Sequence, residues 1–410
     1  MNPPACRLCG ASLHRSFVDL GPTPLANAFV TSEQAAAGLD RAYPLHARVC
    51  DSCLLVQVDD VVGDDLAVTD CPYFSSFSAA WIDYAQSYAG TMIERFSLQA
   101  DSLVMEVASN DGYLLQHFQA AGIPVLGIEP ATNVAAAARL VGIPTEEVSF
   151  NAETAMQIAA QHGRADLVVA TDVLAHVPDL FGFAAGFSAV LRPNGVAVLE
   201  FPHLLRLIED VQFDTIYHAH YSYLSLLVVE HVLRSVGLRV FDAERLPAQG
   251  GSLRVFACHV RGPFQNRPGV KAIRAQETAA GLDQPDHYEG FATRVAHVQR
   301  CFRQFLADRR KSGRRLAAYG AAANGNTFLN SCGVTSRDIV CVADHNPAKQ
   351  GRLLPGSHVP IVAPDALLRD PPDDLLILPW TLASDITSEL QPLREAGTKF
   401  WTACPSMQRV

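Results

Sequence analysis

The sequence has no stretch of about 18 continuous apolar residues, the length that a membrane-spanning helix requires. Its N-terminus also lacks the basic segment followed by an apolar segment that marks a secretory signal, and it carries two cysteines instead. We therefore expect no membrane partner and a cytoplasmic location. In that reducing compartment a disulfide framework is not expected, so paired cysteines need another explanation.

The sequence is also short of basic residues relative to acidic ones. It has 32 Lys and Arg residues against 42 Asp and Glu residues, which leaves a formal net charge of -10. That balance argues against nucleic acid as a partner, because nucleic-acid binding depends on clustered positive charge. It is compatible with a small-molecule substrate, including a nucleotide that a few amides or basic side chains hold.

What the chain does contain is the composition of a folded protein with several domains. Its 410 residues are about two to three times the length of a typical domain. Hydrophobic residues make up 49% and charged residues 18%, which suits packed cores rather than disorder. Two or three domains are therefore expected.

Two C-x-x-C pairs stand out near the N-terminus: Cys6 with Cys9, and Cys50 with Cys53. Each pair can form a tight knuckle that points two thiolates at one ion, and two knuckles supply the four sulfurs of a tetrahedral zinc site. A redox dithiol is the alternative, but it would need only one pair. Because four cysteines leave no open position for water, the sequence predicts a structural Zn²⁺ rather than a catalytic one.

From about residue 101, short apolar segments alternate with helical ones. Segments typical of strands span 102–108, 124–128, 165–171 and 196–200, and segments typical of helices span 113–121 and 134–141. Apolar runs of this length that end in small or polar residues are typical of buried parallel strands. The alternation predicts an α/β fold with a doubly wound parallel sheet and crossover helices.

Two acidic residues stand where ligands bind in such a sheet, at the carboxyl ends of strands. Glu106 lies on the first strand, next to a turn that contains Asn110 and Gly112, and Glu129 closes the second strand. The Glu129 carboxylate suits the two hydroxyls of a ribose, since both of its oxygens accept hydrogen bonds. The turn lacks the G-x-G-x-x-G spacing of dinucleotide sites, which favours S-adenosylmethionine as the cofactor. The alternative is that Glu129 is a solvated acid at a strand end.

A short polar segment, 171–179, follows the strand over 165–171 and is placed where an α/β enzyme lines its pocket. It contains Asp172 and His176. A histidine taken by itself is somewhat more often structural than catalytic, so both interpretations of His176 stay open.

The segment 213–223 is the densest chemical segment of the chain, with two histidines and three tyrosines between Tyr217 and Tyr223. Histidine can remove a proton near neutral pH, and tyrosine can stabilise an enolate oxygen or relay protons. This combination suits methylation of a carbon next to a ketone, for which a base must remove the α-proton. His218 and His220 would face the same side of a strand but would diverge on a helix. A metal site at the two histidines and a purely structural aromatic cluster are the alternatives.

The C-terminal part contains a second set of α/β segments. Segments typical of strands span 315–320, 339–343 and 375–380, and a helix is expected from about Thr327. They predict a second Rossmann-like unit, in which amides at the helix N-terminus can bind phosphate. A scaffold that only closes the active site is the alternative. Residues 268–310 form the connection, within which 292–309 is expected to be an amphipathic helix.

Together these residues resemble one known family along nearly the whole chain, the bacterial nucleotide-sugar C-methyltransferases. Such enzymes combine a zinc-binding lobe, a methyltransferase domain that uses S-adenosylmethionine and a C-terminal Rossmann-like domain. We therefore expect these parts over 1–70, 71–265 and 266–410, the last with its helical connection. The motifs that carry the resemblance are Cys6-x-x-Cys9 with Leu20-Gly-Pro-Thr-Pro-Leu-Ala-Asn27, Cys50-x-x-Cys53, Tyr73-Phe-Ser-Ser76, Glu106-Val-Ala-Ser-Asn-Asp-Gly112, Leu174-Ala-His-Val-Pro178, Asp214-Thr-Ile-Tyr-His-Ala-His220 and Gly250-Gly-Ser-Leu-Arg254.

The resemblance implies a role for the matched residues. Tyr73, His176, Tyr217 and His220 would face the acceptor, with His220 as the general base. The reaction would be methylation of the carbon next to a keto group of a nucleotide-linked deoxysugar, through an enolate, and zinc would take no part in the chemistry. The predicted cofactor site comprises Glu106, Ala108, Asn110, Asp111, Gly112, Glu129 and Asp172.

Three positions depart from the family pattern. Ala219 stands where the family has a glutamate, Asn324 stands where its glycine-rich turn carries a lysine, and the end of the chain from Thr402 differs from the usual ending. The glutamate would orient a histidine or assist proton transfer, and the lysine could pair with a phosphate. The alternatives are therefore a family member with another enolisable acceptor or a non-methylating reaction in the cofactor pocket, or a binding protein with a silent site.

Overall fold

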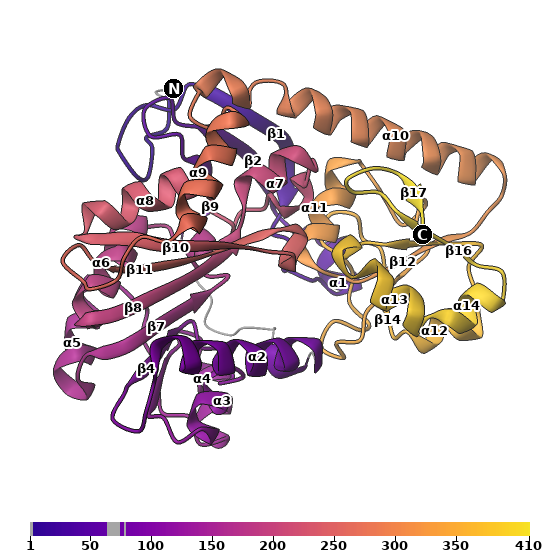
Figure 1. Ribbon diagram of the computed structural model, residues 1–410. Coiled ribbons are helices and arrows are strands. Elements are labelled where there is room, and N and C mark those ends of the chain that lie inside the picture. Colours follow the sequence, from indigo (N-terminus) through magenta and orange to yellow (C-terminus); the bar gives the residue numbers. More distant parts are fainter. Residues whose placement is uncertain (1–2, 64–73, 78) are drawn as a thin grey trace.

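The computed structural model describes residues 3–63, 74–77 and 79–410, and it arranges them around three β-sheets (Figure 1). Each of the three expected parts contributes most of one sheet. Within the described residues, no helix is both long and apolar enough to cross a membrane.

The middle sheet has the strand order β10-β11-β8-β7-β4-β5-β6. The strands from β8 to β6 run parallel, which confirms the predicted doubly wound sheet, and β11 and β10 extend it in the antiparallel sense. Its strands are β4 (Val104–Val107), β5 (Val125–Ile128), β6 (Thr145–Glu146), β7 (Ala165–Thr171), β8 (Leu191–Pro202), β10 (Leu238–Leu246) and β11 (Ser252–His259).

Alternate residues of the middle strands face opposite layers of helices. Val104 of β4 packs toward α2, α3 and α4, whereas its neighbour Met105 packs toward α5, α6 and α8. Both faces are therefore buried, as expected for parallel strands that read as continuous apolar runs. The helices of this part are α2 (Ala79–Phe96), α3 (Leu115–Ala120), α4 (Thr132–Leu140), α5 (Ala152–His162), α6 (Leu180–Val190), α7 (Leu204–Glu209) and α8 (Leu226–Ser235).

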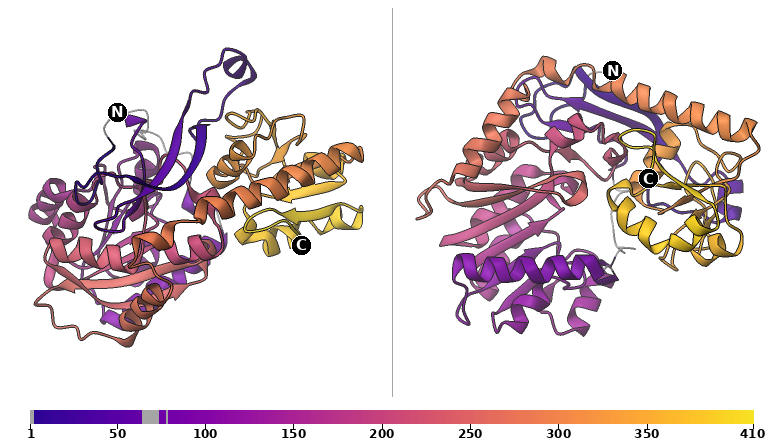
Figure 2. Two further views of the ribbon diagram at one scale, coloured as in Figure 1. Left: turned by 90° about the horizontal axis from the view of Figure 1, so that it is seen from above. Right: turned by 45° about the vertical axis from the view of Figure 1, so that its right-hand side comes forward.

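The N-terminal sheet is antiparallel and borrows a strand from the middle of the chain. Its order is β1-β2-β3-β9, with β1 (Arg15–Pro24), β2 (Ala42–Val49), β3 (Val56–Val58) and β9 (Ser222–Tyr223). The last strand, β9, lies at the end of the histidine-rich segment 213–223, so that segment is attached to the cysteine-bearing lobe. The β1–β2 hairpin, which carries α1 (Ser32–Ala36), extends away from this lobe to the C-terminal unit, as Figure 2 shows.

The C-terminal sheet has the order β14-β13-β12-β15-β16-β17 and is parallel except for β17, which confirms a second Rossmann-like unit. Its first helix begins at Ala323 rather than near Thr327, because Gly320 adopts a φ of 91° and turns the chain into the helix early. The elements are β12 (Leu316–Tyr319), β13 (Val342–Ala343), β14 (Ile361–Val362), β15 (Asp374–Ile377), β16 (Lys399–Thr402), β17 (Gln408–Arg409), α11 (Ala323–Ser331), α12 (Asp365–Arg369), α13 (Ala383–Glu389) and α14 (Gln391–Glu395).

Two helices connect the sheets, α9 (Pro268–Ala279) and α10 (Phe291–Lys311). The second confirms the helix expected over 292–309, and its buried face recurs at Phe291, Val295, Val298 and Phe302, which is the spacing of an amphipathic helix. Phe291 stacks on Phe17 of β1 with ring centroids 4.3 Å apart. One hydrophobic core runs from β1 and β2 through α10 to the C-terminal sheet.

Candidate active site

The four N-terminal cysteines converge on one point. Their sulfur atoms all lie within 4.8 Å of one another, and the Cys6–Cys53 and Cys9–Cys50 sulfur pairs are each 3.5 Å apart. Tetrahedral zinc with Zn–S bonds of about 2.3 Å places its sulfurs about 3.8 Å apart, so the residues present fit the predicted metal. Four thiolates would fill its coordination shell, as a structural zinc site requires.

A buried glutamine supports this cluster from outside. The Gln57 side chain on β3 donates to the Cys6 sulfur at 3.1 Å and accepts from the Arg7 backbone N–H at 2.9 Å. Such outer contacts hold metal ligands in one orientation. The metal cluster is thereby joined to β3, the strand that pairs with β9.

The predicted cofactor turn follows β4 and is built from unusual backbone conformations. Ala108, Asn110 and Gly112 have φ values of 57°, 49° and 80°, in the left-handed region that residues with a Cβ rarely adopt. Only the third of these is a glycine. A run of such residues at the carboxyl end of a strand indicates a binding turn rather than an ordinary connection.

Glu129 at the end of β5 is oriented toward this turn. Its carboxylate accepts hydrogen bonds from the backbone N–H groups of Asn110 and Ala131, each at 2.9 Å. Burial raises the pKa of Glu129, while these two N–H groups oppose the rise. The carboxylate is therefore fixed in place, and its remaining lone pairs are directed by the fold rather than by solvent.

Glu106 and Asp111 each carry an oxygen atom that has no hydrogen-bond partner among the described residues. Glu106 Oε2 and Asp111 Oδ1 are buried, and no described residue supplies either with a hydrogen bond. Burial, with the nearby Glu129 and Asp111, raises the pKa of Glu106 well above its usual range. Buried acceptors without donors suit a ligand that brings N–H or O–H groups, and the ammonium and ribose hydroxyls of S-adenosylmethionine are such groups.

A short segment covers the cofactor turn from the N-terminal side of α2. The backbone N–H of Ser75 donates to Asn110 Oδ1 at 3.0 Å, and that of Ser76 donates to Asp111 Oδ2 at 3.1 Å. Both serines belong to a 3-10 turn over Ser75–Phe77. Tyr73, which the sequence places at the acceptor, lies outside the described residues.

The histidine-rich segment is neither a strand nor a helix where its histidines lie. The backbone N–H of His220 donates to the carbonyl of Tyr217, which closes a tight turn, so the expected periodicity does not apply. The His218 ring bonds the Pro44 carbonyl on β2 instead of joining His220. A metal site built from these two histidines is therefore not formed.

His220 is paired with His176 instead. Their rings are stacked with centroids 5.0 Å apart, and Tyr217 lies 5.4 Å from the His220 ring. His176 ends a 3-10 turn over Leu174–His176, just after β7. Two segments that are far apart in the sequence thus bring one imidazole each to the same place.

The hydrogen bonds of these two rings define their tautomers. Nδ1 of His220 lies 2.8 Å from the Thr215 carbonyl, and Nδ1 of His176 lies 2.6 Å from the Ala219 carbonyl. Because a carbonyl only accepts, each Nδ1 carries the hydrogen, and Nε2 of each neutral ring keeps its lone pair. The pair can therefore take up a proton at either Nε2.

Burial keeps both rings neutral near pH 7. Burial and the neighbouring His176 lower the pKa of His220 to about 3, and burial lowers the pKa of His176. The His176 side chain is partly accessible, and it lines a cavity together with His220. Burial and Asp172 raise the pKa of Tyr217, which keeps the phenol protonated.

Asp172 stands beside the histidines in a strained conformation. Its φ is 55°, and its carboxylate lies 3.5 Å from the Gln249 side-chain nitrogen. Burial and the nearby Glu200 raise the pKa of Asp172 to about 7. An acid held at that point of titration can bind a cation or exchange a proton at neutral pH.

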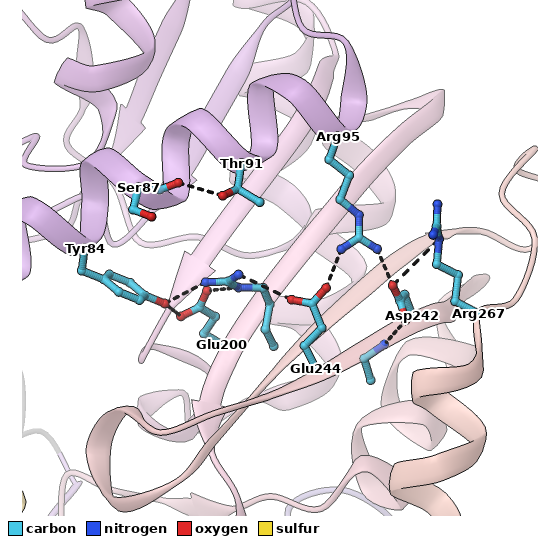
Figure 3. A network of polar contacts seen from close by, with 10 residues as sticks. Tyr84, Ser87, Thr91, Arg95, Glu200, Asp242, Glu244 and Arg267 are labelled. Carbon is cyan, nitrogen blue, oxygen red and sulfur yellow. Dashed lines mark hydrogen bonds and ion pairs between the residues drawn. The ribbon is translucent and has the colours of Figure 1, made fainter.

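A row of charged side chains supports Glu200 from the neighbouring strands (Figure 3). Tyr84 of α2 donates to Glu200, and Arg254 of β11 bonds both of these residues. Further along, Arg95 of α2 bonds Glu244 and Asp242 of β10. Opposite charges alternate along the row, which ties α2 to the three strands at the edge of the site.

Asp172, His176, Tyr217 and His220 line one cavity of about 350 Å³ between the middle and C-terminal units. The sequence predicts these four as site residues and singles out Asn324 as a departure from the family pattern, but it does not identify the rest of the lining. Trp380 was missed although it follows a strand end in a Rossmann-like unit, which is the signal that could have identified it. Asn324 also lines the cavity, and the others are Pro202, Thr215, Gln249, Ala322, Leu378, Pro379, Thr381 and Leu382.

The cavity wall is continuous across the two units because of a contact behind it. Trp380 Nε1 donates to Asp214 Oδ2 at 2.9 Å, and the Cys404 thiol donates to Asp214 Oδ1 at 3.3 Å. Asp214 belongs to the 3-10 turn Phe213–Thr215, which precedes the tight turn Tyr217–His220, the histidine turn. The C-terminal unit is thereby attached to the segment that carries His220.

Three family descriptions match the chain in succession: a zinc binding domain over 6–66, a methyltransferase domain over 81–243 and a C-methyltransferase C-terminal domain over 247–405. The C-methyltransferase NovU of Streptomyces niveus is 34% identical over 400 residues, which cover 98% of this chain and 95% of that protein.

More distant matches cover only part of the chain. A ubiquinone biosynthesis O-methyltransferase of Rhodopseudomonas palustris (strain HaA2) is 31% identical over 97 residues, 23% of this chain and 38% of that protein. The solved structure of the PH0226 protein of Pyrococcus horikoshii OT3 matches 46% of this chain and 94% of its own, with 13% identity and a TM-score of 0.39.

Proposed function

The chain belongs to the C-methyltransferase family, whose members use S-adenosylmethionine and here carry a structural zinc lobe, and we propose that it methylates the carbon next to a keto group of a nucleotide-linked deoxysugar. The observation that carries this proposal is the stacked pair of neutral imidazoles, His176 and His220, in the cavity between the two α/β units. Proton removal next to a carbonyl needs a base of this kind.

His220 is the proposed general base. Its Nδ1–H is held by the Thr215 carbonyl, so its Nε2 lone pair is the atom that takes the α-proton. Because burial and His176 lower the pKa of His220 to about 3, the ring is unprotonated at neutral pH and its Nε2 lone pair is not already occupied by a proton. The negative charge that forms on the acceptor would raise that pKa as the proton arrives.

Tyr217 is the proposed donor to the enolate oxygen. Its hydroxyl stays protonated because burial and Asp172 raise its pKa. A protonated phenol can donate a hydrogen bond to an oxygen that becomes negative during the reaction. When bound, S-adenosylmethionine supplies the methyl group that the acceptor carbon takes up.

Placement of the cofactor follows from the turn after β4. Glu106, Asp111 and Glu129 present carboxylate oxygens there, and Asp172 adds another at the end of β7. Buried acceptor oxygens at this edge suit the ammonium group and the ribose hydroxyls of the cofactor, which donate hydrogen bonds. These residues orient the donor on the side of the cavity opposite the C-terminal unit.

A nucleotide-linked sugar also needs a place for its diphosphate. Among the described residues that line the reaction cavity, none is a lysine or an arginine. A neighbouring cavity of about 650 Å³ shares Trp380 and Thr381 with it and is lined by Arg206 and Arg245. Arg206 is already paired with Glu209 and Asp210, so we assign the diphosphate contact to Arg245.

The lack of a cation in the reaction cavity also favours a second candidate, a smaller enolisable carbonyl compound without a diphosphate. Asn324 stands in the lining where a phosphate-binding lysine is expected, which supports this alternative. The two candidates share the base and the methyl donor, and they differ in what occupies the cavity that Arg245 lines.

A substrate panel distinguishes the two candidates. The enzyme is incubated with S-adenosylmethionine and either nucleoside diphosphate keto-sugars or simple ketones, and S-adenosylhomocysteine and a gain of one methylene at carbon are measured. The proposal predicts turnover with a keto-sugar nucleotide, and an H220N variant with activity lower by about 100-fold or more. H231N, on the exposed face of α8, is the matched control. Turnover of simple ketones alone would establish the second candidate.

Arg245 has its own test. R245Q should raise KM for a nucleotide sugar by about tenfold with little change in kcat, since a diphosphate contact distant from the reacting carbon binds ground state and transition state alike. R337Q, at an exposed arginine of the C-terminal unit, is the control. An unchanged KM in R245Q would show that the diphosphate does not bind in the cavity that Arg245 lines.

A further inference from the structure

We propose that Arg7, which lies between two zinc ligands, is a positioning residue that holds the two histidine-bearing segments in register; its link to catalysis rests on the proposed function above. Arg7 occupies the knuckle between Cys6 and Cys9, and its side chain is half-buried. The sequence gives this position no role beyond that of a spacer in the knuckle.

The Arg7 side chain contacts both segments that carry the paired histidines. Its Nη1 donates to the Pro178 carbonyl at 3.4 Å, and its guanidinium carbon lies 4.9 Å from the centroid of the Tyr221 ring. Pro178 is two residues beyond His176, and Tyr221 directly follows His220. The planar guanidinium of Arg7 therefore bridges the two segments that carry His176 and His220.

A third contact anchors this cation. Arg7 Nη2 donates to the Val58 carbonyl of β3 at 2.8 Å, and the Val58 backbone N–H donates to the Tyr221 carbonyl at 3.1 Å. The guanidinium fork can make bonds in two directions while its flat face stacks on an aromatic ring. The three contacts together fix where Tyr221 and Pro178 lie relative to β3.

The register of these segments decides where the imidazoles lie. His176 is held through the Ala219 carbonyl and His220 through the Thr215 carbonyl, so both rings take their positions from the backbone of the histidine turn. A shift of that turn against the chain at Pro178 would separate the stacked rings. Displacements of about 1 Å of a catalytic group can lower a rate by about 100-fold.

The zinc cluster extends this support to the metal. Gln57 bonds the Cys6 sulfur and the Arg7 backbone, and its strand pairs directly with Ser222 of β9. The knuckle therefore holds Arg7 at its backbone while the side chain reaches the histidine segments. On this basis the zinc lobe positions the base without contacting the reacting atoms.

Two arginine variants test the inference. R7Q removes the fork and the stacked cation, whereas R15Q removes an arginine that also contacts a zinc knuckle, through Asp51, but whose ion pairs lead to Glu289 and Asp286 instead of the histidines. Zinc content, the imidazole carbon NMR signals of His176 and His220 across a pH titration, kcat and KM are measured in each full-length protein.

We expect R7Q to retain zinc, to shift both histidine signals and to lower kcat by about 10- to 100-fold, with KM for S-adenosylmethionine within about twofold of that of the parent protein. R15Q should match the parent in every measurement. A zinc-loaded R7Q protein with unchanged histidine signals would overturn the inference.

If R7Q loses its zinc, Y221L decides the question, because it removes the ring beneath the guanidinium and leaves both knuckles untouched. Shifted histidine signals in zinc-loaded Y221L support the inference, and unshifted signals overturn it. The NMR readout does not depend on turnover. An active H220N variant alongside shifted signals in R7Q would therefore reject the proposed function but not the positioning role.

Discussion

At the scale of single residues, Asp172 is the clearest case of a side chain that the fold holds at a cost in stability. Its pKa is raised from 3.8 to about 7 by burial and by Glu200, so the unfolded chain loses this proton at a lower pH than the folded one. Between those two values the folded state binds more protons, and the free energy of unfolding must fall as the pH rises. Such a cost at the edge of a cavity is typical of a binding group.

Replacing Asp172 with asparagine tests whether the buried carboxylate lowers the stability of the protein. D172N should raise the free energy of unfolding by about 1–2 kcal/mol at pH 8, and by less at pH 5, because the cost of ionisation is complete only above about pH 7. Denaturant unfolding at the two pH values measures the difference. D166N, at a partly exposed aspartate that pairs with Arg192, is the comparison. A gain in D172N that does not depend on pH would contradict the assignment.

Ala219 lies inside the histidine turn, at a position where the family resemblance predicts a glutamate. Its carbonyl holds His176, and its side chain supplies no charge. A219E should raise the pKa of His176 and His220, since a carboxylate close to an imidazole favours the protonated form. NMR titration of the two rings checks this, with A219Q as the control of equal size. Equal pKa values in A219E and A219Q would show that position 219 does not act on the rings through charge.

At the scale of elements, the turn after β4 depends on a glycine for two separate reasons. Gly112 has a φ of 80°, and a Cβ there would lie 2.8 Å from Ile143 Cγ1. Gly122, just beyond α3, has a nearly equal φ of 77° but open space around it. A comparison of substitutions at Gly112 and Gly122 therefore separates the effect of steric contact from the effect of backbone strain.

G112A should therefore destabilise the protein by about 1–3 kcal/mol more than the backbone strain alone that G122A introduces. Only G112A should also weaken binding of S-adenosylmethionine, because only this turn carries the residues that we propose to bind the cofactor. Thermal unfolding and titration calorimetry measure the two effects. Equal losses of stability and of cofactor affinity in both variants would be inconsistent with the role given to this turn.

The sequence predicted elements well where a single pattern determined them. The apolar runs of β4, β5 and β7 and the amphipathic stripe of α10 each contain enough residues to identify the element. The histidine turn could not be predicted from spacing, because two carbonyls and a two-residue strand, β9, determine its shape. The sequence predicts both His176 and His220 as site residues, whereas it does not predict that their rings stack on each other.

At the scale of the whole molecule, the β1–β2 hairpin of the N-terminal lobe contacts the C-terminal unit. Asp40, near the tip of the β1–β2 hairpin, accepts from the backbone N–H of Gly356 at 2.9 Å and bonds the His358 ring at 2.6 Å. A backbone bridge between Val30 and Leu353 lies alongside. This contact fixes the C-terminal unit against the zinc lobe, and thus helps to fix the width of the reaction cavity.

D40N should loosen that contact. We expect a loss of about 1 kcal/mol in the free energy of unfolding and faster hydrogen exchange across the hairpin tip and residues 353–358, because the charge-assisted bonds are weakened. E33Q, on the exposed face of α1 in the same hairpin, is the control. Exchange that is unchanged in D40N would show that the hairpin is held by its apolar contacts alone.

The sequence also predicted three parts at this scale, but not how they share elements. Cysteine spacing and strand patterns are local signals, whereas the pairing of β3 with β9 and the contact of Asp40 with His358 join residues far apart in the chain. The cavity between two units depends on those distant contacts. Gln249 becomes visible as a lining residue only in the assembled fold.

We propose that the His176–His220 pair removes a proton from a carbon next to a carbonyl before that carbon is methylated. The most direct test of this step uses a keto-sugar nucleotide that the enzyme accepts as a substrate. This compound is incubated with the enzyme and S-adenosylhomocysteine in D₂O, and its α-proton is followed by NMR. The account predicts exchange of the α-proton for deuterium in the parent protein and loss of that exchange in H220N. Exchange that continues unchanged in H220N would contradict it.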